Sequence, residues 1–258
     1  MEKLKRPFYT VIVPARNEAD YILATLLSVK KQKTSKDFDI LVIDNGSVDN
    51  TADICKSAGY KVVHEPVAGL PKARETGRQN AKGQYLIYID ADTTMPENYL
   101  ETMADAIDQY PDAVALSNGF NFYDGSVAQN FIIAGYFKLI YPLQSFILWL
   151  IGSSKQVIGG SFVVKAEALE NIGGFNTDIE FFGEDTEISK RLGKLGKIVF
   201  TKKVRVATSA RRFKIDGTVI TSFVYVKNYL SMTLFNRRSD NGLLRQATKL
   251  IFLAEACT

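Results

Sequence analysis

Cysteine is scarce in this sequence and forms no recognisable pattern. Cys55 and Cys257 are the two cysteines, and their separation fits neither a metal-binding spacing nor a disulfide framework. The first residues carry charges, but no apolar core long enough for a secretion signal precedes the first predicted strand. Internal repeats, low-complexity runs and linkers are also lacking. These absences predict a globular cytoplasmic protein with reduced thiols.

The sequence also lacks an uninterrupted apolar run of membrane-spanning length. Its longest apolar stretch, residues 131–151, is interrupted by Lys138 and Pro142, and neither half reaches the ~20 residues that a spanning helix needs. A buried helical pair is one interpretation of this stretch, and an interfacial surface is the other. Aromatic and basic residues at 219–252 suit the headgroup region of an anionic bilayer. We therefore expect a peripheral contact with the cytosolic face of a membrane, or else a soluble core.

Neither positive nor negative charge dominates, since the chain has 32 Lys and Arg and 28 Asp and Glu, for a net charge of +4. Such a mild, dispersed excess suits an anionic ligand or a membrane surface and predicts no nucleic-acid partner. Hydrophobic residues make up 46% of the chain, which is enough for a substantial core.

Apolar β-rich runs alternate with helical patterns from residue 8 to residue 116, which predicts a doubly wound, mostly parallel α/β sheet. The order loosens afterwards, where shorter elements are expected. The predicted strands cover residues 8–13, 39–43, 60–63, 85–89, 113–116, 157–164, 198–200 and 204–208. The predicted helices cover residues 21–31, 50–57, 69–81, 96–109, 165–171, 184–195, 219–235 and 243–256.

The run at residues 85–93, YLIYIDADT, carries the strongest chemical pattern. Its buried strand ends at Asp90 and Asp92, at the edge where open α/β sheets bind ligands. Two carboxylates at this spacing offer hard oxygen ligands to Mg²⁺ or Mn²⁺, and a phosphate can fill further positions. The competing interpretation is a cap for the next helix, because capping uses the same residue types.

Other polar residues follow neighbouring predicted strands. Asp44 ends the second strand, Pro14 to Glu18 follow the first, and the cations Lys72 and Arg74 lie on the third helix. A shared rim of acids, cations and a metal suits a nucleoside diphosphate, because the cations and metal can neutralise the pyrophosphate.

The ordered set of motifs resembles the family 2 glycosyltransferases of the GT-A fold over about residues 8–195. These motifs are Pro14-x-x-Asn17-Glu18, Asp44-Asn45-Gly46-Ser47-x-Asp49, Gly69-x-x-x-Ala73-Arg74-x-x-Gly77, Asp90-x-Asp92 and Glu184-Asp185. The resemblance implies a GT-A type sheet with helices on both faces and a C-terminal helical, acceptor-side region. It implies a catalytic domain over residues 1–210, with donor and acceptor halves meeting near residue 118, and a C-terminal extension over residues 211–258.

The resemblance also implies inverting transfer of a sugar from a UDP- or GDP-sugar to a hydroxyl acceptor, such as a lipid-linked compound or a polysaccharide precursor, assisted by Mn²⁺ or Mg²⁺. Asp185 would be the general base, with Glu184 as the runner-up, although a helix cap also explains this acidic pair. Asp92 would hold the metal, with Asp90 beside it on the ribose. The implied donor-binding residues are Pro14, Asn17 and Glu18 around the nucleoside, Asp44 and Ser47 at the base, Lys72 and Arg74 at the nucleotide, and Gly159 and Gly160 under the sugar.

The sequence departs from the family's pattern in three places. Asn45 stands where a second aspartate is common, and the Gln-x-x-Arg-Trp segment of processive members is missing, which argues against a processive synthase. His64 is the only histidine, so the late metal-binding histidine of some GT-A enzymes is also missing. Arg211 and Arg212 occupy that late region, either assisting the leaving pyrophosphate or simply facing solvent.

Two other functions stay open at this point. A catalytically silent nucleotide-sugar-binding protein would keep the same pocket, although Asp92 and Asp185 argue against it. A sugar nucleotidyltransferase would need a glycine-rich, basic loop after the first strand, and the PARNEA segment at residues 14–19 matches that poorly.

Overall fold

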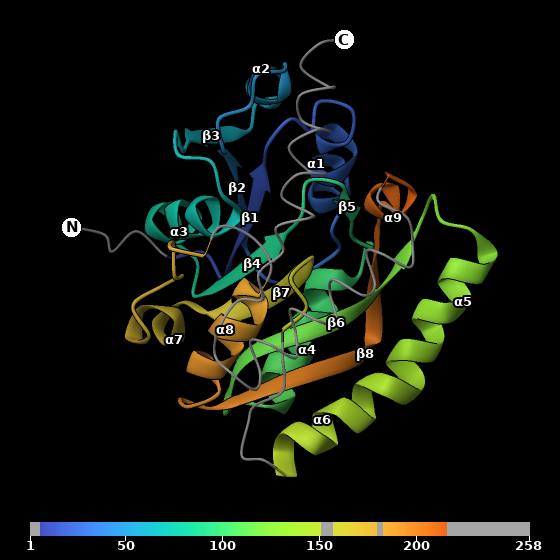
Figure 1. Ribbon diagram of the computed structural model, residues 1–258. Helices are drawn as coiled ribbons and strands as arrows, with labels where there is room; N and C mark the ends of the chain where they lie inside the picture. The colour runs from blue at the N-terminus through green and yellow to red at the C-terminus, as the bar shows by residue number, and fades with distance from the viewer. Residues whose placement is uncertain (1–5, 151–156, 180–182, 216–258) are drawn as a thin grey trace.

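A mixed β-sheet forms the centre of the molecule (Figure 1). The computed structural model describes residues 6–150, 157–179 and 183–215. In these residues the sheet has eight strands in the order β3-β2-β1-β4-β7-β6-β8-β5. The strands are β1 (Tyr9–Ala15), β2 (Phe38–Asp44), β3 (Lys61–His64), β4 (Tyr85–Ile89), β5 (Thr93–Thr94), β6 (Ala113–Phe122), β7 (Ser161–Lys165) and β8 (Lys197–Thr208).

One reversed strand joins two parallel parts of the sheet. β1 pairs in parallel with β2 and β4, and β2 with β3. β7 runs antiparallel between β4 and β6, while β6 and β8 are parallel to each other. The short β5 pairs antiparallel with the end of β8. The strands of both parallel parts therefore point the same way, and their carboxyl ends share one edge.

Helices cover both faces of the sheet because successive strand residues point to opposite sides. Val11 and Val13 of β1 belong to one apolar cluster, whereas Ile12 belongs to the other. The first cluster takes in α1 (Ile22–Lys30), α2 (Thr51–Ser57) and α4 (Tyr99–Gln109). The second takes in α3 (Leu70–Asn80), α7 (Ala166–Asn171) and α8 (Glu184–Leu192). The predicted doubly wound α/β architecture is confirmed.

α3 packs unusually close to the sheet at Gly77. A Cβ atom there would lie 2.5 Å from Ile12 Cγ2, so any side chain would push α3 away from β1. This close packing fixes the position of Arg74, which lies one helical turn earlier on the same buried side of α3.

Several predicted boundaries in the second half were wrong. The strand expected at residues 157–164 begins only at Ser161, because residues 157–160 form a turn in which Ser161 N–H donates to Ile158 O. The two short strands expected at 198–208 are one strand, β8. Its polar middle looked like a break, but a register shift between the pairs Asn118–Thr201 and Gly119–Arg205 absorbs the extra residues.

The apolar stretch that starts at residue 131 is not a buried helical pair, because its helices are continuous and only their inner side is buried. α5 (Val127–Gly135), the π-helix η1 (Tyr136–Ile140) and α6 (Tyr141–Leu150) follow one another as a rod on the outer side of β6 and β8 (Figure 1). Pro142 does not break the rod, because the preceding π-turn, in which Tyr141 N–H donates to Tyr136 O, shifts the hydrogen-bond register. The interpretation as a buried pair is wrong for residues 131–146, where large apolar side chains such as Phe131 and Leu139 are exposed although Phe137 and Tyr141 are buried.

α9 (Arg211–Ile215) follows β8 and ends the described part of the chain. The helices predicted at residues 219–235 and 243–256 lie outside the described residues, as does Ile151. Across the described ranges, no helix combines the length and apolar character needed to cross a bilayer.

Candidate active site

The predicted polar residues meet at the carboxyl edge of the sheet. β1, β2 and β4 end there at Ala15, Asp44 and Ile89, so the loops that follow them are neighbours. β7 runs the other way and begins opposite Ile89, which brings the preceding Gly159–Gly160 turn to the same edge. The reversed strand therefore carries residues from the second half of the chain to the end of β4.

Arg74 is the centre of the first polar cluster. Only 1% of its surface is exposed. Its Nη2 donates to Gly159 O at 2.6 Å and lies 3.5 Å from Asp90 Oδ1, and its Nη1 donates to Glu184 Oε1 at 3.4 Å. The guanidinium lies 5.5 Å from the ring centroid of Phe162. One buried cation thus joins α3, the end of β4, the glycine turn and the start of α8.

The acidic pair at the start of α8 faces the glycine turn. A Cβ atom on Gly159 would lie 3.4 Å from Asp185 Oδ2, and one on Gly160 would lie 3.5 Å from Asp90 Oδ2. Burial and the neighbouring Glu184 raise the pKa of Asp185 to about 7, and Arg74 opposes the rise. Burial similarly raises the pKa of Asp90 to about 6, again opposed by Arg74. Both carboxyls can therefore exchange protons near neutral pH.

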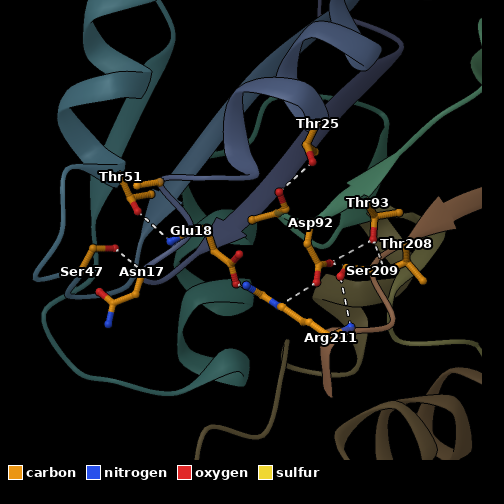
Figure 2. A network of polar contacts seen from close by, with 12 residues as sticks. Asn17, Glu18, Thr25, Ser47, Thr51, Asp92, Thr93, Thr208, Ser209 and Arg211 are labelled. Atoms are coloured by element: carbon orange, nitrogen blue, oxygen red, sulfur yellow. Dashed lines mark hydrogen bonds and ion pairs between the residues drawn. The ribbon is translucent and has the colours of Figure 1, made fainter. Parts of the chain in front are cut away.

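A second cluster is centred on Arg211, at the start of α9 (Figure 2). Its guanidinium reaches between Glu18 and Asp92, with an ion pair to Glu18 Oε1 and a separation of 3.3 Å between its Nε and Asp92 Oδ2. The hydroxyls of Thr93 and Thr208 donate to Asp92 Oδ1 at 3.3 and 3.4 Å. Arg211 therefore ties the end of β8 to the loop after β1 and to the end of β4.

One carboxylate oxygen of Glu18 has no partner in the part of the chain that the structure describes. Its Oε2 is buried and has no hydrogen-bond partner among the described residues, while its Oε1 contacts Arg211. Burial raises the pKa of Glu18 to about 7 against the lowering effect of Arg211, and Asp92 and Asp90 raise it further. A buried acceptor of this kind can take a hydroxyl or a cation.

The loops after β1 and β2 hold each other in place. Asn17 adopts a positive φ of 54°. Its N–H donates to Ser47 Oγ at 3.1 Å, and its Oδ1 accepts from Val48 N–H at 2.9 Å. Glu18 N–H donates to Thr51 Oγ1 at 2.8 Å (Figure 2). These contacts place Asn17, Glu18 and Ser47 together, as predicted.

The side chains of Asp44 and Asn45 form most of their hydrogen bonds with nearby backbone groups. Asp44 is 4% exposed, lies 2.9 Å from His64 Nδ1 and accepts from Ser47 N–H at 3.3 Å. The Asn45 amide donates to Val67 O and accepts from Gly69 N–H, at 2.8 and 2.7 Å. An aspartate at position 45 would lack the amide donor, which gives the departure from the family's pattern a physical reason.

Pro14 and Lys72 lie at the margin of the site. Pro14 is buried in β1 opposite Ile43, and Lys72 is half-buried in the first turn of α3. Within the described ranges, Lys72 forms no ion pair with a carboxylate. The other predicted residues thus lie around Arg74, Arg211 and the interlocked loops, and Pro14 and Lys72 lie beside them.

Sequence reasoning missed three contributors to these clusters. Phe162 lies under Arg74, Thr208 binds Asp92, and the ring of Tyr21 lies 4.7 Å from the Arg211 guanidinium. Phe162 follows the glycine turn by two residues and Thr208 ends a β-rich run, so position along the chain offered a weak signal for both. Tyr21 gave none, because its partner is 190 residues away in the sequence.

The carboxylates suit a divalent ion that arrives with a phosphate ligand. No group of three or more His, Cys, Asp or Glu able to hold a metal occurs within the described ranges. Asp90 and Asp92 supply two hard oxygen groups, and Mg²⁺ commonly binds through one or two carboxylates together with substrate phosphates. The donor set therefore fits a metal–diphosphate complex better than a metal held by protein alone.

A family comparison agrees with this geometry. Residues 10–173 match the sequence model described as glycosyl transferase family 2. The chain belongs to glycosyl transferase family 2. The matched range runs from the second residue of β1 to beyond α7, and hence includes Arg74, Asp90, Asp92 and the glycine turn.

The curated relatives that the chain resembles are also glycosyltransferases. Glycosyltransferase GlyA of Streptococcus pneumoniae serotype 4 is 28% identical over 216 residues, which cover 79% of this chain and 30% of that protein. Glycosyltransferase AglE of Haloferax volcanii is 34% identical over 102 residues, which cover 37% of this chain and 34% of that protein. The chain thus spans less than half the length of these relatives.

Solved structures show the same GT-A type of fold. A mannosyltransferase from Pyrobaculum calidifontis, in complex with GDP-Man and Mn²⁺, superposes with a TM-score of 0.63 at 21% identity, covering 89% of this chain and 64% of that one. TarS of S. aureus, residues 1–349 in complex with UDP, gives a TM-score of 0.60 at 19% identity, covering 91% and 67%. The predicted family and fold are both confirmed.

Proposed function

We propose that this chain is an inverting glycosyltransferase that moves a sugar from a UDP- or GDP-sugar to an acceptor hydroxyl. The observation that supports this most is the convergence of Asp90, Glu184, Asp185 and the Gly159–Gly160 turn around the buried Arg74. A glycine floor beside carboxylates leaves room for a sugar next to a proton acceptor. The proteins with a similar fold that were crystallised with GDP-Man or UDP-GlcNAc support the choice of donor.

In the proposed reaction, Asp185 takes the proton of the acceptor hydroxyl. The acceptor oxygen then forms a bond to the anomeric carbon as the bond from that carbon to the diphosphate oxygen breaks, and the nucleoside diphosphate leaves. A carboxyl whose pKa is about 7 is a better proton acceptor than an ordinary aspartate and is still ionised in half of the molecules at that pH. Glu184 is paired with Arg74 and is the less available of the two.

The remaining residues are proposed to bind the donor. Asn17, Glu18, Asp44 and Ser47, with Pro14 beside them, line the nucleoside side, where their loops interlock. Asp90 takes the ribose, and Lys72 and Arg74 stabilise the nucleotide. Asp92, with Asp90 close by, holds Mn²⁺ or Mg²⁺, which would neutralise the charge of the leaving diphosphate when bound. Arg211 would help to neutralise the negative charge of the leaving diphosphate, because it lies beside Asp92.

We also propose the limits of the catalytic unit. The catalytic domain covers residues 1–210, and the C-terminal extension begins at Arg211, whose contacts to Glu18 and Asp92 make it part of the site. The acceptor is proposed to be a lipid-linked compound or a polysaccharide precursor, met at the cytosolic face of a membrane. The exposed apolar rod on the acceptor half of the chain supports an amphiphilic acceptor.

A donor screen tests the proposal. The purified 258-residue chain is mixed with a panel of UDP- and GDP-sugars, with Mn²⁺ or Mg²⁺, and followed by thermal shift and by nucleoside diphosphate release. A donor present at ~100 times its Kd should stabilise the fold by ~2.7 kcal/mol. Asp92→Ala should abolish the metal-dependent part of donor binding, whereas the exposed-surface change Asp53→Ala should leave it intact.

The outcomes separate the candidate functions. Metal-dependent binding with acceptor-dependent release of UDP or GDP supports the glycosyltransferase. Binding without release from any donor and acceptor pair would identify a binding protein. Pyrophosphate formation from a nucleoside triphosphate and a sugar phosphate would identify a nucleotidyltransferase. Unchanged Mn²⁺-dependent affinity in Asp92→Ala would remove Asp92 from the metal site.

A further inference from the structure

The rod formed by α5, η1 and α6 presents an apolar outer surface. Phe131 is 79% exposed and Leu139 is 68% exposed, and their large apolar neighbours are also exposed. We call these side chains the apolar rod surface: Phe131, Ile132, Leu139, Ile140, Leu143 and Phe146. A contiguous exposed apolar patch on a folded domain marks a contact with a partner or a membrane.

The inner side of the rod is apolar as well. Phe137 and Tyr141 are 3% and 5% exposed. Their ring centroids lie 5.6 and 4.4 Å from that of Phe200 on β8. The rod is therefore held firmly on the sheet by aromatic contacts, and its outer apolar residues are not needed for that packing. Apolar side chains therefore lie on both the packed side and the outer side of the rod.

A basic cavity opens between the rod and the sheet. It has a volume of about 200 Å³ and is lined by Phe137 and Phe200 together with Lys138, Lys202 and Arg205. The register shift in β8 brings Lys202 and Arg205 to the same cavity, and Gly119 opposite Arg205 keeps the space open. Arg205 also lies 6.0 Å from the ring of Phe137.

The three cations of this cavity form no ion pair with the described residues. In the parts of the chain that the structure describes, none of Lys138, Lys202 and Arg205 forms an ion pair with a carboxylate. All three are exposed residues. Lys138 of the cavity is next to Leu139 of the apolar rod surface in the chain. An apolar surface bordered by positive charge matches one kind of partner, in which hydrocarbon lies next to phosphate.

We propose that the apolar rod surface docks on a bilayer containing anionic phospholipid, with a lipid phosphate taken by Lys138, Lys202 and Arg205. The apolar side chains would enter the boundary between headgroups and acyl chains. Each cation near an anionic surface strengthens the attraction roughly fivefold. A soluble protein partner would explain the apolar surface, but it would not by itself explain the cation cluster beside it.

This docking would place the candidate active site close to the membrane. Arg205 and Thr208 lie three residues apart on β8, which is ~10 Å along a strand. Thr208 donates to Asp92, so the basic cavity and the carboxylate site are at two points of the same strand. The proposal does not depend on glycosyl transfer, because it concerns a surface outside the residues assigned to donor and base.

Vesicle co-sedimentation with the 258-residue chain tests the proposal. The probes are vesicles of phosphatidylcholine alone and of phosphatidylcholine with phosphatidylglycerol, each at low and high salt. The unmodified chain should pellet with the anionic vesicles at low salt, and less with neutral vesicles or at high salt. The double variant Lys202→Glu/Arg205→Glu should lower the partition coefficient at least tenfold, and Phe131→Ser/Leu139→Ser should lower it at either salt concentration.

The matched control is Lys30→Glu/Lys194→Glu, which changes the net charge equally at exposed lysines that do not line the cavity. This control should retain more than a third of the binding. Circular dichroism checks that all variants stay folded, which is expected because the altered side chains are exposed.

Three results would overturn the proposal. The first is a chain that stays in the supernatant with anionic vesicles at low salt. The second is an equal loss of binding in the control pair, which would indicate attraction by net charge alone. The third is light scattering that shows a dimer dissociated by Phe131→Ser/Leu139→Ser without vesicle binding, which would make the surface an interface between two copies.

Discussion

Arg74 is the residue on which the charge balance of the candidate site depends. It is almost completely buried and contacts Glu184, whose side chain is 10% exposed, and Asp90, whose side chain is 38% exposed. Removal of one member of a buried ion pair leaves the other charge without compensation. Arg74 therefore has a structural role that can be measured separately from any effect on the reaction.

We expect Arg74→Met to lower the free energy of unfolding by ~3–5 kcal/mol, because Glu184 would remain buried without its cation. Urea unfolding measures the loss. Adding Glu184→Gln to the same chain should recover part of it, since a neutral amide needs no counter-charge. A cost below ~0.5 kcal/mol, as at an ordinary surface position, would show that Glu184 does not need Arg74 as its counter-charge.

Asp185 allows a sharper test of the chemistry. Asp185→Asn keeps the shape of the side chain and can still accept from Thr186 N–H, but it cannot take a proton. Its kcat should fall by ~10²–10⁴, while the affinity for the donor, measured by calorimetry, stays the same. Asp178→Asn makes the same chemical change at an exposed position and should not affect turnover. Normal turnover by Asp185→Asn would move the base elsewhere, with Glu184 the next to be tested.

Residue types and spacing revealed most of this site in advance. Asp90, Asp92, Glu184 and Asp185 are where the sequence predicts them, because strand ends and helix starts are local features. The sequence did not predict that Asp90 pairs with Arg74 while Asp92 pairs with Arg211. It depends on Arg74 and Arg211, which are 16 and 119 residues away from the carboxylates they contact, and a local pattern carries no information about such contacts.

At the scale of elements, the distance between α3 and β1 is set by one glycine. Gly77→Ala would bring a Cβ atom to within 2.5 Å of Ile12 Cγ2, and relief of that overlap should cost ~1–3 kcal/mol of unfolding free energy. Because Arg74 is on the same helix, donor affinity should fall as well. Gly135→Ala is the matched control, since nothing lies within 4 Å of its Cβ.

Gly135 belongs to α5, where alanine is a better helix former, so the control should stabilise the protein by ~0.5–1 kcal/mol. In thermal and urea unfolding, the change in the free energy of unfolding should therefore be negative for Gly77→Ala and positive for Gly135→Ala. A neutral or stabilising Gly77→Ala would mean that α3 can shift without cost, which would contradict the close packing described here.

The elements of the first half were predictable and those of the second half were less so. β1 to β4 and their helices follow a regular alternation, and their observed bounds lie close to the predicted ones. β7 and β8 were misjudged because a glycine turn and a polar register shift do not follow the simple two-residue period of a strand. For the rod the sequence left a buried pair and an interfacial surface open, because burial of an apolar segment depends on what covers it.

At the scale of the whole molecule, the raised carboxyl pKa values predict how stability depends on pH. Burial raises the pKa of Glu18 and Asp185 to about 7 and that of Asp90 to about 6. Between an ordinary carboxyl pKa of ~4 and these values, the folded protein binds more protons than the unfolded chain. The free energy of unfolding of the unliganded protein should therefore fall as pH rises from about 5 to about 7.5.

Urea unfolding across this pH range checks the prediction, and Asp185→Asn should reduce the slope because it removes one of the titrating groups. Carboxyls with lowered pKa values, such as those of Glu75 and Asp124, lose their contribution only at more acidic pH. A free energy of unfolding that rises with pH through this window would contradict the assignment.

Catalysis should respond to pH in the opposite direction. Asp185 must be ionised to accept a proton, so kcat/KM should rise with pH up to about 7 and then level off. Initial-rate measurements at saturating metal check this, with Asp178→Asn expected to give the same profile. A flat profile through neutral pH would exclude a base with this pKa.

The reversed strand β7 also has a consequence for the order in which the sheet can be assembled. β3, β2, β1 and β4 lie within residues 9–89 and can pair as soon as they leave the ribosome. The second edge of β4 must wait for β7, about 70 residues later, which is roughly 4–14 s at ordinary rates of translation. During that interval an apolar strand, Tyr85–Ile89, has free backbone donors and acceptors. The free edge of this strand can pair with nascent chains on other ribosomes of the same messenger RNA. The yield of folded protein in cells should therefore depend on how quickly a chaperone binds that edge.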